Sequence, residues 1–150
     1  MIELKQKLFD LCSAYVSKRI ETANDAIKTA QASANEETKS SAGDKYETGR
    51  AMMQLEIEKN TVQLHEAMKL KQLLDQLQPT KQTTTVQPGS LVITDSTSYY
   101  IAISAGQLTY QNKTYFAIAP TSPIGILMQG LKPGDSFVFN KKKIVINEVV

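Results

Sequence analysis

Apolar residues in the first half of the chain recur at alternating steps of three and four positions. The set begins at Phe9 and ends at Ala34. A mean spacing of 3.5 residues is typical of the seam of a coiled coil. Its members are Phe9, Cys12, Val16, Arg19/Ile20, Ala23, Ile27, Ala30 and Ala34. They become smaller toward Ala34, so we expect a partner helix to approach closely there.

A second, less regular apolar stripe predicts another helix, from Thr48 to Gln78. Its members are Met53, Ile57, Leu64, Ala67/Met68, Leu74 and Leu77. We expect Met52, Met53 and Met68 to pack in the seam, and the Gln78-Pro79 step to end the helix. Neither helix buries its stripe alone. Residues 1–78 are therefore predicted to form an antiparallel coiled-coil hairpin.

The period changes after a polar linker at residues 79–86. Residues 87–150 contain β-branched and aromatic runs typical of strands. These runs are 91–93, 99–103, 114–118, 136–139 and 144–149. Pro123 and Gly130 bound a short helical segment, since proline favours the first turn of a helix and glycine its end. The prediction is an α+β protein, with a small antiparallel sheet carrying one short helix.

Composition narrows the function classes. The formal charge of +2 implies no strongly basic nucleic-acid or membrane surface over the whole chain. Cys12 is the single cysteine, which fits a reducing, cytoplasmic compartment. No apolar run is long enough to span a membrane. His65 has no Cys or His at metal-ligand spacing, which argues against zinc. Lys141–Lys143 fit a solvated turn, or alternatively a polymerase or nucleic-acid contact.

Two carboxylates lie at the break between the predicted helices, within an acidic tip at residues 36–47. The string is Gly43-Asp44-Lys45-Tyr46-Glu47. Asp44 and Glu47 have the spacing of a helix-capping pair. Acids on a long stalk, away from any core, could alternatively be delivered to a place that the body of the protein cannot enter. Both interpretations stay open, whereas Glu36 and Glu37 are expected to be solvated charges.

Two separated motifs resemble the Gre family of transcript cleavage factors. The string Ser122-Pro123-Ile124-Gly125-Ile126-Leu127-Met128-Gln129-Gly130, followed by Pro133-Gly134-Asp135, is similar to a signature of the family's C-terminal domain. The string from Gly43 to Glu47 looks like the Gly-Asp-x-x-Glu at the tip of the Gre coiled coil. The resemblance covers essentially the whole chain and implies an FKBP-like fold for residues 87–150.

The resemblance also implies a function. Gre factors insert their coiled coil into the secondary channel of bacterial RNA polymerase, where the tip acids help to hold Mg²⁺ beside backtracked nascent RNA. Asp44 and Glu47 would be the catalytic and metal-binding residues, with Mg²⁺ shared with the polymerase and no cofactor in the isolated chain. Ser122, Pro123, Ile124 and Gly125 would contact the polymerase. The chain would not be an enzyme itself. A hairpin whose two helices bury each other's apolar stripes favours a monomer.

Some residues depart from the family pattern. Thr48-Gly49-Arg50-Ala51 replaces the usual Asn-Ala-Glu-Tyr, and the tip is longer. One alternative is therefore a channel-binding polymerase regulator without cleavage activity. A prolyl isomerase and a plain coiled-coil adaptor are ranked lower, the former because the second half has no Trp and its aromatic residues mostly alternate within strands.

Overall fold

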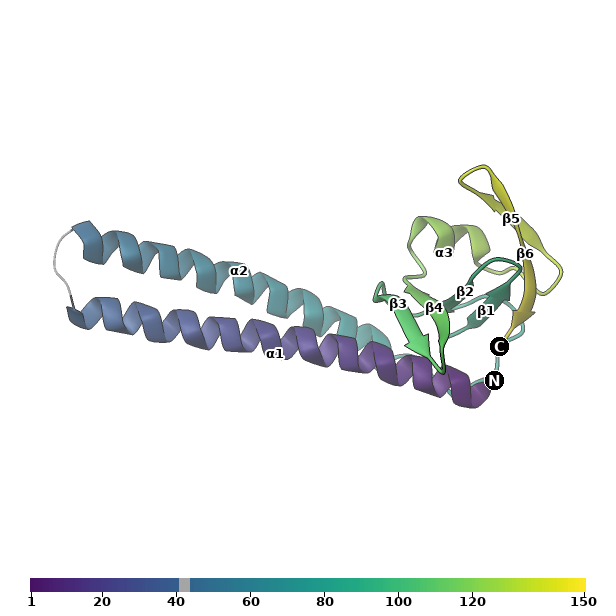
Figure 1. Cartoon of the computed structure of the whole chain (residues 1–150), viewed down its shortest axis with the longest axis horizontal. Coiled ribbons are helices and arrows are strands. Elements are labelled where there is room, and N and C mark those ends of the chain that lie inside the picture. Colours follow the sequence, from purple (N-terminus) through teal and green to yellow (C-terminus); the bar gives the residue numbers. More distant parts are fainter. Residues whose placement is uncertain (41–43) are drawn as a thin grey trace. The chain divides into compact units, whose positions relative to one another are not determined.

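A computed structural model describes residues 1–40 and 44–150, with side chains described outside residues 37–46. The protein is α+β, and its described elements run from two long helices to a six-stranded sheet (Figure 1). They are α1 (Ile2–Ser40), α2 (Asp44–Asp75), β1 (Leu91–Thr94), β2 (Ser98–Ile101), β3 (Gly106–Tyr110), β4 (Lys113–Ile118), α3 (Pro123–Met128), β5 (Ser136–Phe139) and β6 (Lys142–Val149). No helix in these described ranges is both long and apolar enough to cross a membrane.

The chain divides into two compact units. The sheet unit contains Met1–Tyr15 and Gln72–Val150, and the helix unit contains Val16–Lys71. The base of α1 and the end of α2 therefore pack as part of the sheet unit. The predicted division into 1–78, 79–86 and 87–150 stays a prediction.

In the helix unit, small side chains on α1 and α2 are buried. Val16, Ala23 and Ala30 recur every seven residues on α1 and are buried, as is Ala67 on α2. Arg19 Nη2 donates to Gln63 Oε1 at 3.5 Å, which ties the two helices side by side. The burial follows the period of 3.5 predicted for α1.

Two methionines of α2 lie outside the seam, contrary to the prediction. Met52 is 60% exposed and Met68 is 49% exposed, whereas Met53 is half-buried. Ala67 takes the buried position beside Met68, and residues adjacent in a helix point about 100° apart. The helix also begins at Asp44 rather than Thr48 and ends at Asp75 rather than Gln78.

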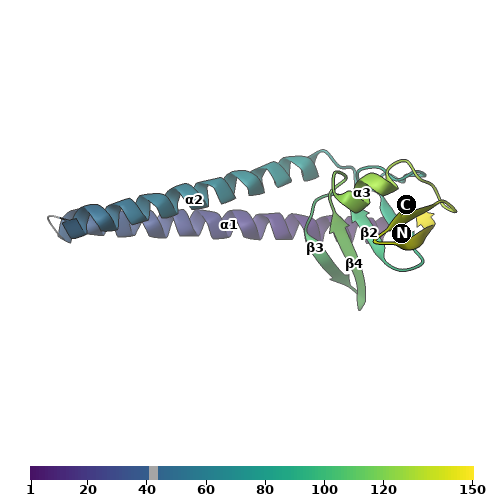
Figure 2. The ribbon, with the colours of Figure 1, turned by 90° about the horizontal axis from the view of Figure 1, so that it is seen from above.

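The sheet has the strand order β3-β4-β2-β1-β6-β5. All neighbouring pairs are antiparallel except β2 and β4, which are parallel, with Tyr99 opposite Phe116. The sheet is thus mixed, and the prediction of an antiparallel sheet was wrong at this pair. Strand β3 was not predicted. Along the chain, β3 lies between β2 and β4, and it pairs with β4 in an antiparallel hairpin (Figure 2). As a result, β4 runs in the same direction as β2.

The sheet carries apolar side chains on both faces. Successive side chains of a strand point to opposite faces, so Val92 and Ile101 lie on one face and Leu91 and Tyr100 on the other. The first face builds a core with α3 through Ile124, Met128 and neighbouring strands. The second face carries Tyr100, whose pKa is influenced by Cys12 and Asp10 at the base of α1. The sheet unit is therefore covered by helix on both faces.

A lysine near the start of α1 is fully buried. Lys5 is 0% exposed, and its Nζ donates to the backbone oxygen of Lys81 at 2.6 Å. Burial lowers the pKa of the Lys5 ammonium. Burial also raises the pKa of the Cys12 thiol to about 12 and raises the pKa of Tyr100, with smaller contributions from Cys12 and Asp10. Of these three buried groups, Cys12 is a predicted member of the seam, whereas the apolar pattern did not predict the burial of Lys5.

Residues 79–86, predicted as a polar linker, are held against the sheet. The Thr83 hydroxyl bonds to the Ser90 hydroxyl and to the backbone oxygen of Val150 at 2.9 Å. Val86 is buried and exchanges backbone hydrogen bonds with Gly130 and Leu131. This segment has no helix or strand, yet its buried backbone is fixed by hydrogen bonds.

Candidate functional site

The predicted acidic site lies where α1 ends and α2 begins. Residues 41–43 lie outside the described residues, and so do the side chains of Asp44 and Glu37. The backbone is helical from Asp44 onward, and Glu47 follows three residues later in the first turns of α2. The Glu47 side chain is exposed. Residues three apart are neighbours on a helix surface, so the helix brings these two positions together.

The start of α2 favours carboxylates on electrostatic grounds. The first backbone N–H groups of a helix have no intrahelical acceptor, and the helix dipole is positive at this end. A carboxylate in the first turns is therefore stabilised whether it caps the helix or faces outward. The capping interpretation and the metal interpretation of Asp44 and Glu47 both stay open.

The described part of the chain contains no group of three His, Cys, Asp or Glu side chains close enough to hold a metal ion. Mg²⁺ is commonly bound by one or two carboxylates, with water and phosphate oxygens completing its octahedron. An exposed carboxylate such as Glu47 fits a partial ligand set of this kind. Asp44 would be the second ligand, and a partner would complete the coordination.

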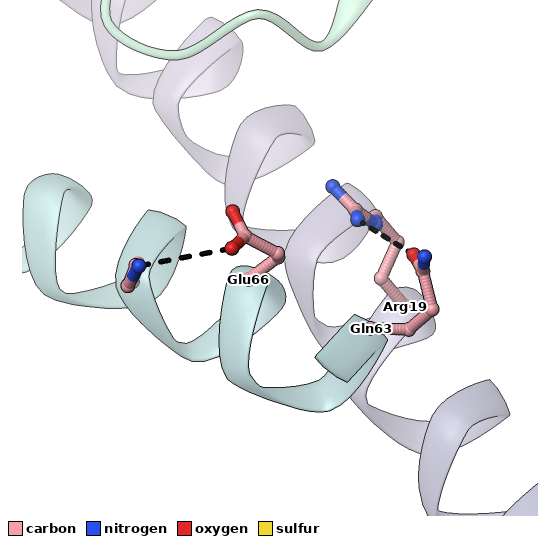
Figure 3. A network of polar contacts seen from close by, with 4 residues as sticks. Arg19, Gln63 and Glu66 are labelled. Atoms are coloured by element: carbon pink, nitrogen blue, oxygen red, sulfur yellow. Dashed lines mark hydrogen bonds and ion pairs between the residues drawn. The ribbon is translucent and has the colours of Figure 1, made fainter. Parts of the chain in front are cut away.

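Further along the helix unit, polar side chains form a local network (Figure 3). Arg19 of α1 meets Gln63 of α2, and Glu66 pairs with Lys69 at 3.7 Å. Asn60, half-buried on α2, donates to the backbone oxygen of Glu56 at 2.8 Å. The Arg19–Gln63 hydrogen bond joins the two helices, whereas the Glu66–Lys69 ion pair and the Asn60 hydrogen bond lie within α2. We assign these contacts to holding the helix pair and α2 itself.

The second predicted site is the start of α3, where Ser122 acts as the N-cap. Its Oγ accepts a hydrogen bond from the backbone N–H of Gly125 at 3.1 Å and donates to the backbone oxygen of Ala119 at 2.7 Å. Pro123 follows in the first turn, where its missing N–H is not needed. The first two residues of the motif therefore begin the helix.

The next two residues are buried beneath the helix. Ile124 belongs to the core of the sheet unit. A Cβ at Gly125 would collide with the backbone oxygen of Ala119 and with Ser122 Oγ, so only glycine fits there. Ser122, Ile124 and Gly125 thus have structural roles whether or not they lie under a partner, and Pro123 is the exposed member of the four.

Two residues of the same motif, not singled out from the sequence, form the exposed side of α3. Ile126 is 60% exposed and Leu127 is 44% exposed. Together with Pro123 they form what we call the α3 apolar surface. The sequence signal was partial, because a short helix that packs on a sheet buries one side only, and apolar residues on its other side, here Ile126 and Leu127, stay exposed.

No protein-family model and no curated protein matches this chain.

Proposed function

We propose that this chain is a Gre-type transcription elongation factor. It binds bacterial RNA polymerase through the secondary channel and stimulates cleavage of backtracked nascent RNA by helping to hold a catalytic Mg²⁺. The observation that carries the proposal is the position of the Gly-Asp-x-x-Glu string. It falls at the junction of two long helices, α2 begins at its Asp44, and Glu47 is exposed.

The proposal takes α1 and α2 as an antiparallel coiled coil and the sheet unit as FKBP-like. The buried alanines support the first part, since small seam residues allow two helices to approach closely. Asp44 and Glu47 lie at the start of α2, and the Glu47 side chain is exposed. They act on a substrate that the polymerase holds, so the chain is an activator rather than an enzyme.

The α3 apolar surface supports a protein partner. Pro123, Ile126 and Leu127 expose apolar side chains together on one short, rigid helix. Such groups are typical of a binding surface when they are rigidly presented. We propose that the polymerase covers this surface, while Ser122, Ile124 and Gly125 fix the geometry of the helix beneath it.

Bound Mg²⁺ would activate water and stabilise the leaving oxygen during phosphodiester hydrolysis. The part played by this chain is simpler. Its two carboxylate positions lie one helical turn apart at the start of a helix, whose backbone fixes their spacing. Both positions lie at the N-terminal end of α2. Because a helix rises about 1.5 Å per residue, the length of α2 separates them from its C-terminal end.

A cleavage assay on stalled, backtracked polymerase tests the proposal. Asp44→Asn with Glu47→Gln should lower stimulated cleavage at least about tenfold, equivalent to about 1.4 kcal/mol of barrier, with polymerase binding retained. Asp25→Asn with Glu58→Gln is a control of equal charge change, since Asp25 is exposed on α1 and Glu58 is exposed on α2. Unchanged cleavage in the first variant would overturn the proposed role of the acids.

The alternative of a regulator without cleavage activity rests on the residues after Glu47. Gly49 lies inside α2, where glycine weakens a helix by about 1 kcal/mol relative to alanine. For this alternative, wild-type protein should bind the polymerase yet leave cleavage unchanged. The hollow beside α3 lined by Pro88, Ile101 and Gly125 measures about 10 Å³, which is room for about one water and not for a proline side chain at that place.

A further inference from the structure

The hairpin of β5 and β6 carries three consecutive lysines, one in the turn and two at the start of β6, that the proposed function does not use. Lys141, Lys142 and Lys143 are all exposed. Asn140 and Lys141 have φ of 51° and 64°, the left-handed values of a two-residue hairpin turn. The lysines are therefore presented on a regular two-stranded hairpin of defined register.

This hairpin extends past the rest of the sheet (Figure 1). β5 pairs with Lys142–Val145 of β6, whereas β1 pairs with β6 at Ile146, Glu148 and Val149. The segment Val138–Lys143 thus forms a ribbon of two strands, which we call the lysine ribbon. It is anchored by Phe137 and Ile144, which are buried in the core of the sheet unit.

The positive charge of the lysine ribbon is not neutralised. In the described part of the chain, no ion pair to these lysines is formed, and their cross-strand neighbours are apolar, with Val138 opposite Lys143 and Phe139 opposite Lys142. Two nearby carboxylates, Asp95 after β1 and Asp135 before β5, accept hydrogen bonds from backbone N–H groups. Asp95 accepts from Val145 N at 3.1 Å and Asp135 accepts from Lys132 N at 3.0 Å.

We propose that the lysine ribbon binds the phosphate backbone of duplex DNA by entering the major groove. Paired strands lie about 4.8 Å apart, and the major groove of B-form DNA, about 12 Å wide, admits a two-stranded ribbon. Lys143 shares the outer face of the ribbon with exposed Val138, whereas Lys142 lies opposite Phe139, which packs partly against the core. All three lysines lie at or beside the turn and are exposed, so the tip of the ribbon presents their charges together. A groove surrounds such a tip with phosphates on two sides, whereas a flat acidic protein surface meets it from one side.

The interaction does not depend on the base sequence of the DNA, since lysine ammonium groups contact phosphates as point charges. It is also independent of the proposed cleavage function, because it uses neither the acids of α2 nor the α3 apolar surface. The small net charge of the whole chain does not oppose it, because the charge that matters is local and unpaired.

The test is fluorescence anisotropy with a labelled B-form duplex of about 20 base pairs, using the full chain. Between about 50 and 200 mM salt, three lysine–phosphate contacts should weaken binding about 40-fold. Replacing all three, Lys141→Gln, Lys142→Gln and Lys143→Gln, should reduce the slope of log affinity against log salt by about 2.7. The single change Lys143→Gln, which leaves the turn residues intact, should reduce it by about 0.9.

A charge-matched control separates a local site from a general effect. Lys18→Gln, Lys28→Gln and Lys59→Gln remove the same charge from exposed positions of the helix unit, and should leave the slope unchanged. Equal weakening by both triple variants would overturn the proposal, and so would the absence of salt-dependent duplex binding. Equal or tighter binding of polyglutamate would assign the ribbon to an acidic protein partner instead. Duplex RNA has a narrow major groove, so tighter binding of RNA would exclude entry into the groove.

Discussion

At the scale of single residues, polar groups are buried at the base of α1 and in β2. Lys5 and Cys12 are fully buried, and the Tyr100 hydroxyl is the one buried side-chain polar atom without a hydrogen-bond partner among the described residues. An unpaired buried hydroxyl costs about 1–3 kcal/mol. The burial of Lys5 could not be predicted from hydrophobic periodicity, because Lys5 has the seam spacing but the wrong polarity.

Cys12 predicts a loss of stability at alkaline pH. The unfolded thiol ionises near its ordinary pKa of 9.0, whereas the folded thiol keeps its proton up to a pKa of about 12. Between these values the folded state binds more protons, so the free energy of unfolding falls with pH by about 1.4 kcal/mol per pH unit. Tyr100 acts in the same direction, and Lys5, whose folded pKa is lowered, acts in the opposite one.

The change Cys12→Ala isolates the thiol. Urea unfolding at several pH values from about 8 to 11 should give a shallower loss of stability in the variant than in the wild type. The comparison uses slopes, so a constant cost of the smaller side chain cancels. Parallel curves for the two proteins would show that the thiol titrates alike in both states.

Gly125 is a second residue-scale constraint. Gly125→Ala places a Cβ against the backbone oxygen of Ala119. Because a carbonyl in a hydrogen-bonded turn cannot move away easily, we expect a loss of about 1–3 kcal/mol. Thermal unfolding measures it, with Gln129→Ala, at an exposed position of the same motif, as the control. A neutral Gly125→Ala variant would mean that the turn before α3 is not rigid.

At the scale of elements, helices were predicted more accurately than strand pairing. The period of 3.5 identified the buried alanines of α1, since burial follows helix geometry directly. Strand β3 was missed because only Leu108 of its five residues is buried. Its turn, Gln111-Asn112, adopts positive φ at both residues without a glycine to mark it.

The parallel pairing of β2 and β4 also could not be predicted from the pattern. Alternation of buried and exposed residues shows which face each side chain takes, and it is the same for both strand directions. Only the insertion of β3 between these strands in the chain decides the direction. The short helix α3, by contrast, was predicted from Pro123 and Gly130, because its start and end are set by local backbone chemistry.

Because the two long helices pack closely at Ala67, we expect a larger side chain there to lower the stability of the protein. Ala67 is 0% exposed, so Ala67→Leu must push the helices apart or distort a rotamer, at a cost of about 1–3 kcal/mol. Circular dichroism during heating should show a lower melting temperature for this variant. Ala51→Leu, at an exposed position of the same helix, is the control, and equal melting temperatures for both variants would contradict close packing at Ala67.

At the scale of the whole molecule, the functional proposal combines two sites that lie in different compact units. The start of α2 belongs to the helix unit and α3 belongs to the sheet unit. Both were proposed from sequence motifs, and Lys141–Lys143 were also noted in the sequence. The structure adds that Ile126 and Leu127 remain exposed on α3, and it adds the strand register that presents the lysines on a hairpin. Exposure and strand register depend on the folded chain, so the motifs alone could not supply them.

The most direct test of the central claim is the Mg²⁺ dependence of cleavage by backtracked polymerase saturated with this protein. If Glu47 helps to hold the ion, Glu47→Gln should raise the Mg²⁺ concentration for half-maximal cleavage at least about tenfold, or about 1.4 kcal/mol of binding free energy. Excess Mg²⁺ should restore much of the rate. A variant with the same Mg²⁺ dependence as the wild type, at equal polymerase occupancy, would contradict the account.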